Sequence, residues 1–199
     1  METLFPIQAD YPQGFMYLPD FISEVEEMAL NEIIKDIQLH TFTFQGYEAK
    51  RRVASFGYDW NFDSRVLTKG QEIPPAFTPL INTVASYLAI DKSEIIELLV
   101  TEYPEGSVIN WHRDAPPFDI IIGISLMADC VFRLRPHEKA LQTRKSIISC
   151  PIKRRSLYVM QGPARSEWQH STAPVKERRL SITLRTMRSD MPSKMLRNF

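Results

Sequence analysis

The stretch from residue 95 to residue 126, IIELLVTEYPEGSVINWHRDAPPFDIIIGISL, contains three short runs rich in apolar and β-branched residues. Turn-forming Pro, Gly and Asp residues separate these runs, a pattern typical of successive β-strands. Four further runs of this kind occur at residues 131–134, 146–150, 156–160 and 180–186. About seven short strands at this spacing predict a sandwich, a barrel or a jelly roll.

Two amphipathic helices are expected before this β-rich region. Ser23 and Glu26 have the spacing of a capping box, and apolar residues follow them at helical spacing. A proline pair at residues 74–75 introduces a second apolar stripe, which runs from Leu80 to Leu88. The sequence therefore predicts an α+β fold in which two N-terminal helices buttress a β-rich core.

Length and composition favour a single domain. The chain has 199 residues, of which 44% are hydrophobic and 24% charged, close to ordinary globular usage. The apolar stretch at residues 120–127 is far shorter than a membrane span, and residues 1–13 lack the basic segment of a signal peptide. We therefore expect no membrane contact and a cytoplasmic location, or a nuclear one in a eukaryote. We also expect a monomer.

The net charge of zero hides an uneven distribution along the chain. Residues 131–199 contain 16 Lys and Arg against 4 Asp and Glu, whereas residues 1–130 contain 8 against 20. A basic face built from the last third of the chain would suit a polyanion such as nucleic acid. If the two parts interleave in one fold, their charges instead mix, and the sequence leaves both alternatives open.

Three residues form a candidate metal site. His112 and Asp114 are two residues apart at the end of an expected strand, so their side chains point the same way. His170, from a distant strand, would complete two nitrogen ligands and one oxygen ligand. This set leaves positions open for substrate and oxygen in non-haem Fe(II) oxygenases, but zinc in a hydrolase would use similar ligands.

A second signal is the run RLSITLR at residues 179–185. Alternation along a strand gives it one polar face, made of Arg179, Ser181, Thr183 and Arg185. If this face lies inside the fold, its two guanidinium groups need anionic partners, because an unpaired buried charge is very costly. A dicarboxylate cosubstrate would supply such partners. The alternative is an exposed strand whose arginines pair with acids of residues 1–130.

Together these motifs resemble the AlkB-type Fe(II)/2-oxoglutarate-dependent dioxygenases. That family carries HxD, a later His and an R-x-N-x-T-x-R strand, in which Ser181 replaces the usual Asn here. Its upstream N-x-Y-x-x-G motif reads TEYPEG at residues 101–106. The resemblance covers residues 45–187. It implies a double-stranded β-helix (jelly roll) core in residues 91–190, and N-terminal helices with a substrate lid in residues 1–90 of a single domain, residues 1–199.

The resemblance also implies residue roles. The catalytic iron ligands would be His112, Asp114 and His170. The residues that bind 2-oxoglutarate would be Thr101, Tyr103, Arg179, Ser181, Thr183 and Arg185. Arg179 would pair with the distal carboxylate, assisted by the Tyr103 hydroxyl, and Arg185 would lie nearer the iron. Because Thr101 and Ser181 are shorter than the amides they replace, we expect weaker cosubstrate binding.

The implied reaction consumes O2, decarboxylates 2-oxoglutarate to succinate and hydroxylates a C–H bond. On a methylated base nitrogen, the product then loses formaldehyde. The resemblance therefore implies oxidative dealkylation of bases such as 1-methyladenine and 3-methylcytosine in DNA or RNA.

The region that resembles the substrate lid combines aromatic and basic residues. Phe56, Tyr58 and Trp60 alternate beside Arg51 and Arg52. We expect the aromatic rings to stack on a base and the arginines to contact phosphates. The alternative is that the three aromatic residues form one face of a core strand.

One departure from the family favours other substrates. Several nucleobase demethylases have an acidic residue soon after HxD, whereas Ala115, Pro116 and Pro117 follow Asp114 here. The same chemistry would then act on a protein side chain, or modify a tRNA. A non-enzymatic binding module would leave the two arginines of residues 179–185 without buried partners, and a metal-dependent hydrolase would give that strand no role.

Overall fold

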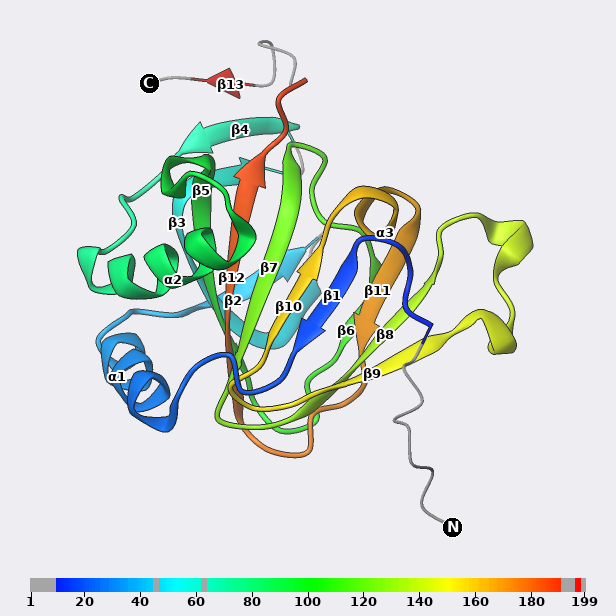
Figure 1. The fold of residues 1–199 in the computed structure, drawn as a ribbon, viewed down its shortest axis with the longest axis horizontal. Helices are drawn as coiled ribbons and strands as arrows, with labels where there is room; N and C mark the ends of the chain where they lie inside the picture. Colours follow the sequence, from blue (N-terminus) through cyan, green and yellow to red (C-terminus); the bar gives the residue numbers. More distant parts are fainter. Residues whose placement is uncertain (1–9, 45–46, 62–63, 191–195, 198–199) are drawn as a thin grey trace.

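The computed structural model describes residues 10–44, 47–61, 64–190 and 196–197. Within these residues two β-sheets face each other, and two helices cover the outer face of the larger sheet (Figure 1). From edge to edge, the larger sheet contains β1 (Phe15–Leu18), β10 (Leu157–Met160), β7 (Phe118–Leu126), β12 (Arg179–Met187), β5 (Ile95–Tyr103), β3 (Tyr47–Asn61), β4 (Val66–Lys69) and β13 (Leu196–Arg197), with β2 (His40–Phe44) paired to β3.

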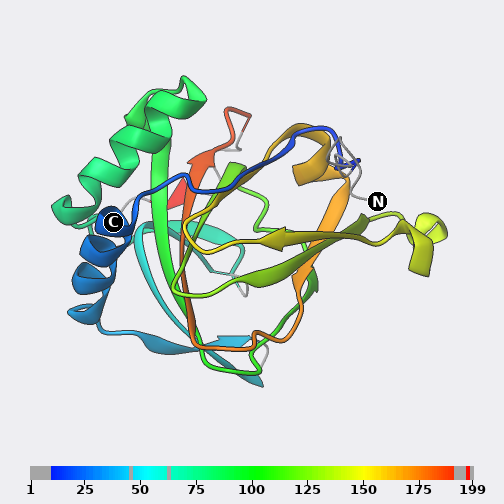
Figure 2. The ribbon, with the colours of Figure 1, turned by 60° about the horizontal axis from the view of Figure 1, so that its bottom comes forward.

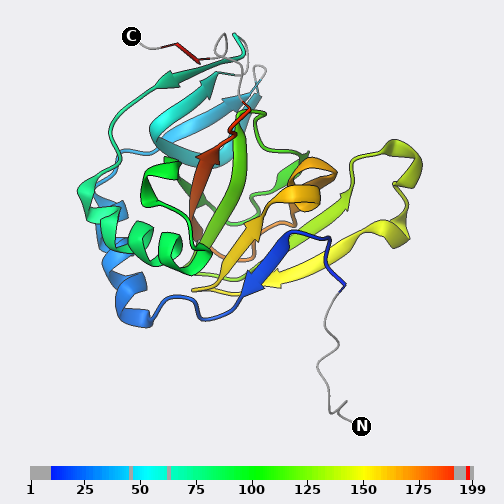
Figure 3. The same ribbon diagram turned by 45° about the horizontal axis from the view of Figure 1, so that its top comes forward.

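The smaller sheet carries the segment expected to hold the metal. Its strands, in order, are β6 (Ile109–His112), β11 (Trp168–Thr172), β8 (Cys130–Pro136) and β9 (Ile148–Ile152). Paired strands are antiparallel, apart from the parallel pair of β13 and β4. The connection between β8 and β9 extends away from the body of the molecule (Figure 3) and contains the short 3-10 helices η3 (Lys139–Leu141) and η4 (Arg144–Ser146).

The helices lie where the sequence predicts them. α1 (Glu24–Lys35) begins at Ser23, whose side chain and that of Glu26 form the expected capping box. α2 (Thr78–Leu88) follows η1 (Pro75–Phe77), and η2 (Lys92–Glu94) leads into β5. Figure 2 shows α1 and α2 together on the side of the larger sheet that faces away from the smaller sheet. The helix α3 (Gly162–Ser166) lies just before β11.

Two hydrophobic cores follow from this layering. One lies between the helices and the larger sheet, and β12 contributes Leu180, Ile182 and Leu184 to it. The other lies between the two sheets and includes Phe132 and Leu134 of β8. The predicted α+β fold with a jelly-roll core and buttressing helices is therefore confirmed.

The chain before residue 91 contains more than the predicted helices and lid. β1 pairs with β10 at one edge of the larger sheet, and β3 pairs with β5 in its interior. These strands complete the main sheet. In the described part of the chain, no helix combines the length and apolar character that a membrane crossing needs.

The uneven charge of the sequence is partly neutralised by the fold. Basic residues of the last third form ion pairs with acids from the first 130 residues: Lys153 with Asp129, Arg154 with Glu27, Arg155 with Asp20 and Glu24, Arg178 with Glu102, and Arg185 with Glu97. The two parts of the chain therefore interleave, and much of their opposite charge mixes.

Candidate active site

The three predicted metal ligands meet at one end of the smaller sheet. His112 ends β6 and lies directly opposite His170 of β11, and Asp114 follows two residues after His112. Ligand atoms of the three side chains all lie within 4.8 Å of one another. Nδ1 of His112 lies 2.8 Å from the carbonyl oxygen of Asn110. Because Nδ1 donates its proton there, Nε2 is left to bind a metal.

The protonation states of this triad suit a metal. Burial, followed by the nearby His112, lowers the pKa of His170 to about 3, so its imidazole is neutral at neutral pH. Burial by itself raises the pKa of Asp114, but the nearby charges, that of Arg185 first, together outweigh burial and hold the pKa below its usual range. The site therefore offers a neutral imidazole from His170 and a carboxylate from Asp114.

One oxygen atom of the triad has no hydrogen-bond partner within the described residues. Oδ2 of Asp114 is buried without a hydrogen bond and lies 3.5 Å from Nε2 of His170. A buried anionic oxygen is costly unless something binds it. With the two imidazoles it forms the two-histidine, one-carboxylate set that suits Fe(II) and leaves coordination positions open. The residues present therefore fit an iron ion.

The other carboxylate oxygen of Asp114 is held by Arg185. Nη2 and Nε of Arg185 lie 2.8 and 3.2 Å from Oδ1 of Asp114, and Nη1 lies 2.8 Å from Oε2 of Glu97. The exposed fractions of the Arg185, Asp114 and Glu97 side chains are 13%, 5% and 4%. Arg185 is thus buried and paired with two acids of the protein itself, which fixes the orientation of Asp114.

Glu97 was not predicted as a site residue. It lies opposite Arg185 in the register between β5 and β12, and burial raises its pKa. A signal was present in the sequence, because Glu97 is four residues before Thr101 and six before Tyr103. Alternation along β5 therefore places all three on the same face.

A second buried cation lies at the other end of the same polar face. Arg179 is 2% exposed, donates from Nε to Oγ of Ser125 at 3.0 Å, and has its guanidinium 4.9 Å from the centre of the Tyr103 ring. Within the described residues no carboxylate lies within ion-pair distance of it. Because such a charge needs an anion, this end of the polar face suits the carboxylate of a small molecule.

The cross-strand register connects the two ends. β12 and β5 pair Arg179 with Tyr103 and Ser181 with Thr101, and β7 places Ser125 next to Ser181. Thr183, two residues further along, is 8% exposed on the same face. The prediction of an inward polar face on β12 is confirmed. Ser125 was not predicted, because its neighbours Ile124 and Leu126 gave no reason to separate it from an apolar strand.

Arg165 of α3 supports the loop that carries Asp114. Its Nη2 donates to the carbonyl oxygens of Asp114, Ala115 and Phe118, at 3.2, 2.7 and 3.0 Å. These three bonds hold the segment that follows the HxD motif. The residue pattern alone gave no sign of this contact, because it joins segments that are about fifty positions apart.

The predicted substrate residues are divided between different faces. Gly57 has a φ of +85°, and a Cβ there would lie 2.0 Å from the carbonyl oxygen of Ile96, so only Gly fits. Before this point Phe56 is buried against the helices, whereas beyond it Trp60 is buried between the sheets with Tyr58 packed near it. The three aromatic residues therefore do not share one face, and Phe56 and Trp60 are core residues.

The two neighbouring arginines also diverge. Arg52 forms an ion pair with Glu102, which Arg178 also contacts, on the side of the sheet that faces the helices. Arg51 is partly buried near Tyr103, and burial lowers its pKa. Of this pair, only Arg51 lies near Tyr103, whose ring the guanidinium of Arg179 also contacts.

A metal triad, a buried cation and a jelly roll together define an Fe(II)/2-oxoglutarate-dependent oxygenase. The comparisons agree: the family model for the 2OG-Fe(II) oxygenase superfamily matches residues 14–189, and the chain belongs to this superfamily. Its relatives identify it as an AlkB-type member.

Two relatives and one solved structure illustrate the similarity. The mouse protein named tRNA (carboxymethyluridine(34)-5-O)-methyltransferase ALKBH8 is 27% identical over 83% of this chain and 25% of its own length. The cattle RNA demethylase ALKBH5 is 28% identical over 57% of this chain and 30% of its own. The structure of OsALKBH1 superposes with a TM-score of 0.68 at 16% identity, covering 89% of this chain and 99% of that one. The chain thus spans less than a third of the length of these two relatives.

The cofactors of this class are Fe(II), 2-oxoglutarate and O2, and when bound they supply the oxidation of a C–H bond, which side chains cannot perform. The protein's own residues do the rest. His112, Asp114 and His170 would hold the metal, Arg185 orients Asp114, and Arg179 would offer its charge to the cosubstrate.

Proposed function

We propose that this protein oxidatively dealkylates N-alkylated nucleobases, such as 1-methyladenine and 3-methylcytosine, in DNA or RNA. One observation carries the proposal: a complete triad and a buried cation that has no carboxylate partner among the described residues occur together in an AlkB-type chain. The triad supports the oxidative chemistry, and the AlkB-type relatives support a nucleic-acid substrate. One relative is named an RNA demethylase, which supports a nucleic acid as the substrate.

The test is direct reconstitution. The protein is loaded with Fe(II) and 2-oxoglutarate without oxygen, and then mixed with O2 and a single-stranded oligonucleotide that carries one methylated base. We expect succinate and formaldehyde to form in equal amounts, and the unmethylated oligonucleotide to give much less of both. The Asp114→Asn variant is the matched control. Equal succinate release from methylated and unmethylated strands would refute the proposal.

A second candidate function is hydroxylation of a tRNA base or a protein side chain without loss of an alkyl group. Two observations favour it. The segment after Asp114 supplies Ala115, Pro116 and Pro117 where several demethylases have an acid, and one relative is named a tRNA-modifying enzyme. Mass spectrometry of a tRNA pool and of a peptide panel separates the two functions. A hydroxylated product gains one oxygen and releases no formaldehyde.

A further inference from the structure

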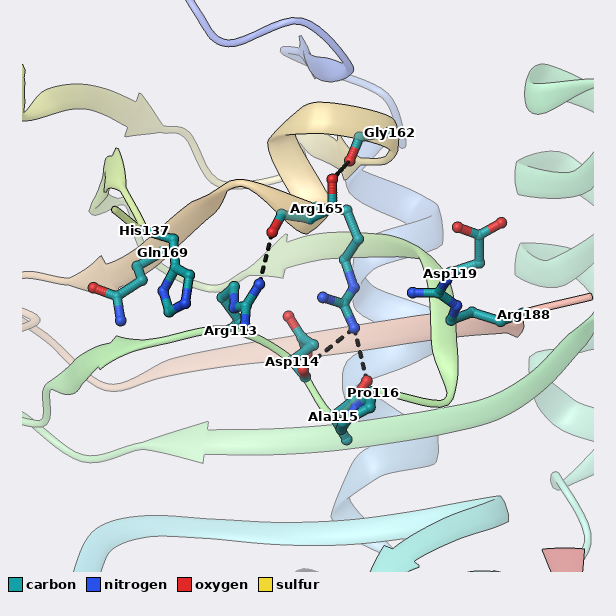
Figure 4. Close-up of a pocket in the computed structure, with 11 residues that line it drawn as sticks. Arg113, Asp114, Ala115, Pro116, Asp119, His137, Gly162, Arg165, Gln169 and Arg188 are labelled. Atoms are coloured by element: carbon teal, nitrogen blue, oxygen red, sulfur yellow. Dashed lines mark hydrogen bonds between the residues drawn. The ribbon is translucent and has the colours of Figure 1, made fainter. Parts of the chain in front are cut away.

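A pocket of about 620 Å³ lies beside the metal triad, between the segment that follows β6 and the helix α3 (Figure 4). Asp114 lines the pocket and belongs to the triad as well. Gln169, which also lines it, directly precedes His170 in β11. The pocket and the metal site are therefore neighbours along the same two segments of chain.

Three guanidinium groups line this pocket, from Arg113, Arg165 and Arg188 (Figure 4). All three line the same pocket, so their positive charges repel one another. An anion between them would relieve that repulsion.

Two of these arginines have carbonyl partners and no carboxylate partner within the described residues. Nη1 of Arg113 donates to the carbonyl oxygen of Ser166 at 2.7 Å. Arg165 donates to three carbonyl oxygens through Nη2, and its buried Nε has no partner in the described part of the chain. Carbonyl oxygens satisfy N–H groups but leave the positive charge uncompensated.

The acids at the pocket compensate this charge only in part, because three arginines and two aspartates line it. Asp114 is already paired with Arg185, and Asp190 pairs with Arg188 at the surface. Asp119 lines the pocket and is exposed, on the side of Arg188. Several other basic residues of the last third of the chain pair with acids, as Arg154 does with Glu27. The pocket thus keeps an excess of positive charge.

We propose that this pocket binds a phosphate group of the nucleic-acid strand, next to the nucleotide whose base reaches the metal. The inference rests on the proposed function and names one contact of that substrate. A phosphodiester carries one negative charge and presents acceptor oxygens that suit guanidinium donors. A base that is turned out toward a buried metal has its own phosphates one sugar away. A pocket that shares Asp114 with the metal site is therefore placed to receive one of them.

Binding without turnover tests this inference. The protein, loaded with Fe(II) and 2-oxoglutarate in the absence of O2, is titrated into a fluorescent single-stranded oligonucleotide that carries one 1-methyladenine, at several salt concentrations. The variants are Arg113→Gln and Arg188→Gln, both of exposed side chains, and circular dichroism checks that each variant is folded. Lys92→Gln removes the same charge from an exposed residue of η2, outside the pocket, and is the matched control.

We expect Arg113→Gln to weaken binding about tenfold, because it removes one hydrogen bond to a charged group. The slope of log K against log salt should flatten by about 0.7, the value of one phosphate contact on a single strand. Arg188→Gln should act in the same direction by less, since Asp190 already holds this side chain, and Lys92→Gln should change neither quantity.

Unchanged affinity and slope in Arg113→Gln would overturn the inference, and if the wild-type protein still demethylates the strand, the proposed function stands. Arg113-dependent binding of the strand without any turnover when O2 is added would leave the inference in place and remove the proposed function. An acidic peptide that binds through Arg113, together with no binding of the oligonucleotide, would overturn the inference in favour of a protein partner.

Discussion

Replacing Arg179 by Met should separate cosubstrate binding from stability. Met fills nearly the same volume but carries no charge. Arg179 is 2% exposed and has no carboxylate partner within the described residues, so its removal leaves no acid unpaired. We therefore expect the metal-free protein to keep its melting temperature or to gain a little. The substitution should act on 2-oxoglutarate instead.

The size of that effect follows from the burial of Arg179. Truncating one partner of a buried charge pair costs about 2–5 kcal/mol, which is a roughly 30-fold to 4,000-fold rise in the KM for 2-oxoglutarate. Arg179→Lys should recover only part of the loss, because an ammonium group cannot make two parallel hydrogen bonds to a carboxylate. Succinate release measured over a range of 2-oxoglutarate concentrations gives both values.

Two results would refute this reasoning. A KM that stays at the wild-type value in both variants would mean that residues other than Arg179 hold the carboxylate of 2-oxoglutarate. A large fall in melting temperature for Arg179→Met would mean that the protein itself stabilises the guanidinium, through Ser125 and Tyr103, and that the group does not need a bound anion.

The other substitutions act on the metal triad, on the buried residues that support it, and on the bend of β3. His112→Ala and His170→Ala should each abolish 2-oxoglutarate turnover with little change in circular dichroism, and near wild-type succinate release by either would remove that residue from the ligand set. Arg185→Ala should destabilise the protein by about 3–5 kcal/mol in urea unfolding, because it leaves two buried carboxylates uncompensated, and a smaller cost than about 1 kcal/mol would contradict the pairing. Glu97→Gln should weaken binding of Mn(II), measured by calorimetry, by about 10- to 100-fold, since a neighbouring charge that helps hold a ligand is lost; unchanged affinity would show that Glu97 does not act on the metal. Gly57→Ala should cost more than about 2 kcal/mol, because it adds a Cβ against a carbonyl oxygen at a positive φ, and a neutral outcome would mean that β3 does not need its bend.

The sequence predicted those parts of the structure that depend on local alternation. The two faces of β12 could be assigned because polar and apolar residues alternate without interruption from Arg179 to Arg185. The spacing of His112 and Asp114 likewise predicted that their side chains point the same way, and their ligand atoms do lie together. The capping box at Ser23 placed the start of α1, since both of its hydrogen bonds join residues three positions apart.

The predictions that were wrong or missing concern contacts between segments that lie far apart in the sequence. The turn of β3 at Gly57 reverses which residues face inward, so alternation carried through it placed Phe56 with Tyr58 and Trp60. The partner of Arg185 depends on the register of β12 against β5, which no short-range pattern encodes. The contact of Arg165 with the carbonyl groups after Asp114 likewise requires the fold to be known.

The claim that the metal triad and Arg179 form an Fe(II)/2-oxoglutarate site is tested most directly by calorimetric titration of 2-oxoglutarate without oxygen. The titration compares the metal-free protein, the Fe(II)-loaded protein and the Fe(II)-loaded Arg179→Met variant. We predict one molecule bound per chain in the Fe(II)-loaded wild type, much weaker binding without Fe(II), and a loss of affinity in the variant. Binding that is equally tight with and without Fe(II), or that survives the loss of Arg179, would contradict the assignment of this site.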